Sequence, residues 1–158
     1  MGDNNNIRVI SSGDAEIGEA LKLKWVKTII VENGNLVIDK NISYSDTLPV
    51  TPSSYAFIVK NGNIVIGKDV TNIAWVYVTL SGAIMSDGNS TPNRLTVEWS
   101  LYGNTKDLVD NRTYVRGQTG YSALNVGVVV NYSNRAIMYP PPFLSRFLDQ
   151  YSLQRVSR

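Results

Sequence analysis

The chain of 158 residues carries a formal net charge of +2, with 43% hydrophobic and 18% charged residues. It contains no cysteine and no histidine, which excludes disulfides, thiol catalysis, zinc sites built from these ligands and every histidine-based triad. The small charge and the lack of a basic cluster with interleaved aromatics argue against a nucleic-acid partner. The length suits a single domain spanning residues 1–158.

Four short segments repeat a glycine turn followed by a β-run. Their glycines are Gly13, Gly34, Gly62 and Gly82, spaced by 21, 28 and 20 residues. A repeat of this size, built from one turn and a short strand, is typical of a solenoid. We therefore predict an all-β protein, a parallel β-helix (β-solenoid) of about five to six coils of roughly 20 residues each.

Within each repeat, the residues after the glycine alternate as a strand requires. The predicted inward core ladder consists of Ala15, Ile17, Leu36, Ile38, Ile64, Ile66 and Ile84. Asn33 and Asn61 precede two of the corner glycines and could form a hydrogen-bonded ladder between stacked coils. Asparagine-glycine is also the best short hairpin signal, so two unrelated hairpins are the alternative. Four copies that keep one inward register favour the solenoid.

The coils are expected to follow one another along the chain, interrupted once. Residues 7–44 form the first coils, and residues 45–54 form an inserted loop, because Pro49 and Pro52 cannot join a central ladder. In the run from 74 to 80, we predict that Ala74, Val76, Val78 and Leu80 point inward. Trp75, Tyr77 and Thr79 would then lie on the outer face.

The C-terminal residues 140–158 depart from the repeat. Pro140, Pro141 and Pro142 cannot continue a ladder. A short amphipathic helix follows, and its apolar face is predicted to consist of Phe143, Leu144, Phe147, Leu148 and Tyr151. We expect this helix to cap the open end of the last coil, and the alternative is that the same face docks onto another subunit.

The repeats and their glycine-asparagine corners resemble right-handed parallel β-helix proteins and, more loosely, bactofilins. Three segments are similar to β-solenoid segments at the C-terminal ends of large bacterial surface proteins. They run from Ile29 to Leu36, from Ser54 to Ile64 and from Pro140 to Leu144. This likeness covers most of residues 27–148. It implies a right-handed solenoid and specifies activity hardly at all.

Many parallel β-helices cleave polysaccharides, which requires grouped carboxylates or a basic residue with calcium. The best local cluster is Asp107 and Asp110, with Lys106 or Arg112 nearby. A solvated turn is the favoured interpretation of this cluster. Asp87-Gly88-Asn89 resembles the start of a calcium loop but lacks the later acidic ligand. We therefore predict no catalytic residues, no metal site and no cofactor.

Trp75 and Tyr77, placed on the outer face, could form an aromatic platform that stacks on a glycan. Trp99 and Tyr102, whose facing the sequence leaves open, could extend it. The same residues could equally lie under loops or in an interface.

The leading functional hypothesis is a structural β-solenoid module of a bacterial cell-surface or filamentous protein, acting as a spacer, a cap or an assembly interface. The alternatives are a carbohydrate-binding module and, less favoured, a polysaccharide lyase or hydrolase. The expected partners are flanking repeats or subunits of the same protein and, in the alternative, carbohydrate. No run of about eighteen apolar residues is present, so no membrane span is expected. We expect an extracellular or cell-surface location for a fragment lacking its signal peptide, and a cytoplasmic location is the alternative.

Overall fold

The computed structural model describes residues 6–23, 25–44, 53–88, 93–112, 126–132 and 139–144. Eleven strands and one helix follow in chain order within these ranges. The strands are β1 (Ile7–Ile10), β2 (Ala15–Ile17), β3 (Leu21–Leu23), β4 (Val26–Asn33), β5 (Leu36–Ile38), β6 (Ile42–Tyr44), β7 (Ser54–Asn61), β8 (Ile64–Ile66), β9 (Asn72–Ser86), β10 (Leu95–Asn104) and β11 (Val128–Asn131). The helix is α1 (Lys106–Asn111).

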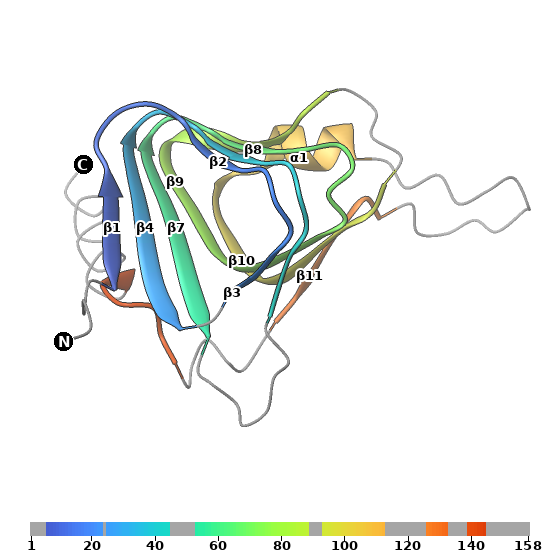
Figure 1. Ribbon diagram of the computed structural model, residues 1–158. Coiled ribbons are helices and arrows are strands. Elements are labelled where there is room, and N and C mark those ends of the chain that lie inside the picture. The colour runs from blue at the N-terminus through green and yellow to red at the C-terminus, as the bar shows by residue number, and fades with distance from the viewer. Residues whose placement is uncertain are drawn as a thin grey trace, which may run out of the picture.

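The strands stack in parallel on three faces around a common interior (Figure 1). Face A contains β1, β4, β7, the central part of β9 and the second half of β10. Face B contains β2, β5, β8 and the end of β9. Face C contains β3 and β6, followed by the starts of β9 and β10 and by β11. The predicted fold class is therefore confirmed, with about 4 turns instead of five to six coils.

The register between coils agrees with the predicted core ladder. Ala15, Leu36, Ile64 and Ile84 are successive partners on face B, and Ile17, Ile38, Ile66 and Ser86 form the next row. Leu36, Ile38, Ile64 and Ile66 are at most 2% exposed. Identical spacing after each glycine thus places equivalent side chains above one another, and the coils share one apolar core.

The three tryptophans of the chain lie at the corner that leads from face C to face A. Trp25, Trp75 and Trp99 all have positive φ, at 84°, 87° and 137°. Trp25 separates β3 from β4, while Trp75 and Trp99 are paired in the register of β9 and β10. A positive φ in a bulky residue is uncommon, and at Trp75 and Trp99 it turns a continuous strand from one face to the next. This corner was not identified from the sequence.

The aromatic residues near this corner pack inside the solenoid, which corrects the predicted facing of β9. Tyr77 stacks on Phe57 with ring centroids 5.2 Å apart, and Trp75 contacts Tyr55 at 5.0 Å and Tyr44 at 5.3 Å. Tyr44 belongs to the buried side of β6, so the cluster lies in the interior. By alternation, Val76 and Val78 then point outward. The prediction had assigned these two sets of residues to the opposite sides.

The outer side of face A is nevertheless buried at its centre. Val9, Ile30, Ile58, Val78 and Tyr102 form one row across the face. Ile58 and Val78 are almost fully buried, whereas the row's two ends are exposed, Val9 by 49% and Tyr102 by 45%. An apolar row of this kind requires cover from another part of the chain.

Part of the C-terminal segment lies beside this outer side. Thr28, in β4, donates a hydrogen bond from its hydroxyl to the carbonyl of Pro142, and residues 139–144 run beside β1 and β4 (Figure 1). Leu144 is buried and Phe143 is 51% exposed. The helix predicted for residues 143–151 was expected to cap the last coil, whereas the described residues at its start lie beside one of the first coils, next to Thr28. Phe147, Leu148 and Tyr151 lie outside the described residues.

The inserted loop predicted for residues 45–54 ends earlier than expected. Residues 45–52 lie outside the described residues, and Ser54 already belongs to β7. Its amide donates to the carbonyl of Trp25 at 3.0 Å, and its side chain is buried. The strand therefore begins directly at the corner.

Candidate functional site

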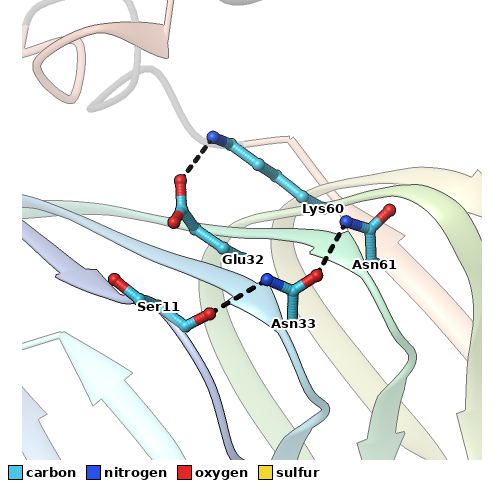
Figure 2. Close-up of polar contacts among 5 residues, drawn as sticks. All are labelled: Ser11, Glu32, Asn33, Lys60 and Asn61. Atoms are coloured by element: carbon cyan, nitrogen blue, oxygen red, sulfur yellow. Dashed lines mark hydrogen bonds and ion pairs between the residues drawn. The ribbon is translucent and has the colours of Figure 1, made fainter.

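The corner between faces A and B carries a ladder of side-chain amides on its outside (Figure 2). Asn61 donates from Nδ2 to Oδ1 of Asn33 at 3.1 Å, and Asn33 donates to the carbonyl of Ser11 at 3.0 Å. Beside the ladder, Lys60 and Glu32 form an ion pair of 2.8 Å. The asparagine ladder predicted from the sequence is therefore present, and it links three successive coils.

A second ladder lies two residues further along and was not predicted. The Oδ1 atom of Asp14 accepts from the amide of Asn35 at 2.7 Å, and that of Asn35 accepts from the amide of Asn63 at 2.9 Å. Asn63 in turn accepts from the amide of Ala83 at 2.9 Å. Each side chain therefore satisfies a backbone donor of the next coil that the parallel ladder would leave unpaired. The repeated Gly-Asn and Gly-Asp pairs were the signal for it.

The corner glycines allow the backbones of successive coils to approach closely enough for the hydrogen bonds of both ladders to form. A Cβ added to Gly62 would lie 2.0 Å from the carbonyl oxygen of Gly34, and one on Gly34 would lie 2.2 Å from that of Gly13. Gly82 repeats the relation, with 1.9 Å to the oxygen of Gly62. No other residue type fits at this separation. The predicted corner residues are thus stacked in one column.

A third group of hydrogen bonds lies at the corner that leads from face B to face C. Asn41 accepts at Oδ1 from the amides of Thr71 at 2.8 Å and Asn72 at 3.2 Å. Asn72 donates from its side chain to the carbonyl of Ile42 at 3.0 Å. Asn41 and Thr71 are 30 positions apart in the chain, with the insert between them. Their hydrogen bond was therefore not predicted from the repeat spacing.

The end of the solenoid near α1 is closed by a buried arginine. Arg112 is 1% exposed and donates to the carbonyls of Val70 at 2.6 Å and Gly67 at 2.7 Å. Desolvation lowers the pKa of its guanidinium to about 10. Leu108 of α1 is fully buried beside it, because α1 packs against β9 where another face B strand would lie.

The carboxylate cluster considered for polysaccharide cleavage is solvated, as the favoured interpretation expected, but it lies on a helix and not in a turn. Asp107 and Asp110 are exposed on α1, and Asp110 pairs with Lys106 one turn away. The hydrogen bond to Asp110 raises the pKa of Lys106. Arg112 points into the core and bonds only to backbone carbonyls within the described part of the chain, so it does not share a site with the two carboxylates.

The remaining site predictions concern metals and glycans. Within the described ranges, no group of three or more acidic residues is placed to hold a metal ion, and no helix is long and apolar enough to cross a membrane. Trp75 and Tyr77 are fully buried, so they cannot form the exposed aromatic platform predicted for a glycan. Burial raises the pKa of Tyr77 well above its usual value, and its hydroxyl donates to the carbonyl of Ala74 at 2.8 Å.

The N-terminal end of the solenoid is open among the residues that the structure describes. Among the described strands, β1, β2 and β3 each have a partner on one side only. Val9 is 49% exposed and Trp25 is 66% exposed, and the core residues Ile10, Ala15 and Leu21 are only half-buried. The backbone amides of Asn35 and Asn63 each donate to a side-chain oxygen of the coil below. The backbone amide of Asp14 has the equivalent position in the first coil, and no described coil lies beneath it. Within the described part of the chain, the first coil therefore presents unpaired strand edges on all three faces.

Comparisons with known proteins identify no relative: no family model, curated protein or solved structure matches the chain. The resemblance to bacterial surface proteins and to bactofilins is accordingly unsupported, and the parallel β-solenoid rests on the structure itself.

Proposed function

We propose that the chain is a structural β-solenoid module that joins a larger assembly through its N-terminal coil. The observation that carries this proposal is the difference between the two ends. Arg112 and Leu108 close the last coil on face B with buried side chains. By contrast, no described strand pairs with the outer edges of β1, β2 and β3, which lie on all three faces. Such edges are templates for pairing with another β-structure.

The ladders support the same direction of assembly. The first three coils each supply a side-chain oxygen, from Asp14, Asn35 and Asn63, that accepts from a backbone amide of the coil above. A coil placed below the first one would supply the missing acceptor for Asp14. The carbohydrate-binding alternative is less favoured, because Trp75 and Tyr77 are buried. The enzyme alternative is less favoured, because no described cluster brings together the carboxylates that polysaccharide cleavage needs.

The test is to lengthen the solenoid by one coil. A second copy of residues 5–25 inserted ahead of residue 5 adds 21 residues, which is the offset between Ile7 and its partner Thr28. The added Asp14 would then accept from the original Asp14 amide. A matched control carries the same 21 residues in scrambled order.

If the edge accepts another coil, the lengthened chain should have a higher melting temperature and a steeper dependence of stability on urea, because a repeat interface and buried surface are added. Amides of the first coil should also exchange more slowly. An added coil that stays unprotected, with a melting temperature equal to that of the scrambled control, would contradict the proposed function.

A further inference from the structure

The open N-terminal coil carries opposite charges at the centres of its two short strands. Glu16 is the middle residue of β2, and Lys22 is the middle residue of β3. Both side chains are exposed. Because the neighbours of Glu16 point into the core, Glu16 itself lies on the outer surface of face B, and Lys22 has the same position on face C.

A twofold axis perpendicular to face A relates these two strands to one another. Such an axis, passing through the middle of β1, reverses the strand direction and exchanges faces B and C between two copies. The spacing agrees with this symmetry, since Glu16 lies seven residues after Val9 and Lys22 lies eight before Ile30, the partner of Val9 in the next coil. The two short strands are therefore almost equally far from the axis.

We infer that the N-terminal coil binds a second copy of this chain end to end, with antiparallel pairing of β1 with β1, and of β2 with β3, across the interface. This inference rests on the proposed function and names the partner. Glu16 of one copy then lies directly opposite Lys22 of the other, twice by symmetry. Opposite charges at such positions stabilise antiparallel pairs, and like charges destabilise them. A self-complementary patch of this kind is what a twofold dimer requires.

The same axis fixes the register of β1. When Val9 lies opposite its own copy, Arg8 lies opposite Ile10, so the two arginines do not face each other. The exposed Val9 then loses its contact with water. A head-to-tail filament is disfavoured, because α1 stands at face B of the other end, where a strand edge would be needed.

The experiment measures the oligomeric state of the chain and of charge variants by analytical ultracentrifugation. Wild type should be a dimer. Glu16→Lys and Lys22→Glu should each raise the dimer dissociation constant by about thirtyfold, because two symmetry-related pairs change from attraction to repulsion. The double variant should dimerise again, and an equimolar mixture of the two single variants should form a heterodimer. High salt should weaken the wild-type dimer.

Charge-matched controls are Asp69→Lys and Lys68→Glu, which are exposed in a turn after β8, away from the first coil. They should leave the dimer unchanged. A wild-type monomer at every concentration, or a dimer that Glu16→Lys leaves intact, would overturn the inference. The lengthened chain separates the two proposals: if it gains stability while wild type stays monomeric, the edge accepts a parallel coil and only the second copy is wrong.

Discussion

Replacing Gly62 with alanine tests whether close contact between coils holds the solenoid together. The new Cβ would lie 2.0 Å from the carbonyl oxygen of Gly34, whereas ordinary contact begins at 3.4 Å. The coils would have to separate by about 1 Å or more at this corner. The hydrogen bonds from Gly34 to Asn61, at 3.0 Å, and from Asn63 to Asn35, at 2.9 Å, span the same gap.

The matched control is Gly13→Ala. Gly13 also has positive φ, at 88°, but an added Cβ there meets nothing within 4 Å, and no described coil lies beneath it. Its substitution therefore reports backbone strain alone, about 1–2 kcal/mol. Gly62→Ala adds the loss of two hydrogen bonds at about 1 kcal/mol each and the separation of packed coils. We expect it to cost about 4–5 kcal/mol.

Urea and thermal denaturation followed by tryptophan fluorescence measure both variants, since Trp75 and Trp99 are buried. Gly62→Ala should lower the melting temperature by roughly 10–15 °C and Gly13→Ala by about 3–6 °C, given the size of the domain. Equal losses at the two positions would refute the reasoning, because they would show that φ, and not coil contact, sets the cost.

Three further predictions concern single side chains. Ile64→Ala should reduce the free energy of unfolding by about 2–5 kcal/mol, whereas Val65→Ala, on the half-exposed side of β8, should cost less than about 1.5 kcal/mol in the same urea titration. Arg112→Met should destabilise by about 2–4 kcal/mol, because two buried carbonyls lose their donor, and Arg112→Lys should not restore the stability. Since burial raises the pKa of Tyr77, its neutral form stabilises the fold below about pH 10 and this stability is lost as pH rises further. Alkaline unfolding should be less steep in Tyr77→Phe, and an unchanged slope would place the pH dependence elsewhere.

The core of face B could be predicted because its signal is local. Each strand there follows a corner glycine by two residues, so aligning the glycines aligned Leu36 with Ile64 and Ile38 with Ile66. One side of these strands is buried and the other half-exposed, which preserves the alternation that a strand pattern needs. The asparagine ladder followed from the same alignment.

Face A could not be predicted in this way because both of its sides are buried at the centre. In β7, the residues from Ser54 to Val59 are all buried, and so are the residues of β9 from Ile73 to Thr79. Alternation then carries no information about which side is the interior. The outer side of face A is identified by the hydrogen bond from Thr28 to Pro142, and these two residues are 114 positions apart in the chain. Likewise, α1 replaces a strand on face B, so the coil count fell short of the prediction.

The side chains of the second ladder also account for the direction in which the solenoid can grow. A ladder passes from one coil to the next only if each coil supplies both a backbone amide and a side-chain oxygen. Asn35 and Asn63 supply both, but Ala83 supplies only the amide, so the ladder ends in the fourth coil. At the other end, the carboxylate of Asp14 accepts from the amide of Asn35. The backbone amide of Asp14 itself faces away from the described coils. The second ladder therefore ends at Ala83, where α1 takes the place of a further face B strand, and it could continue in a coil added below Asp14.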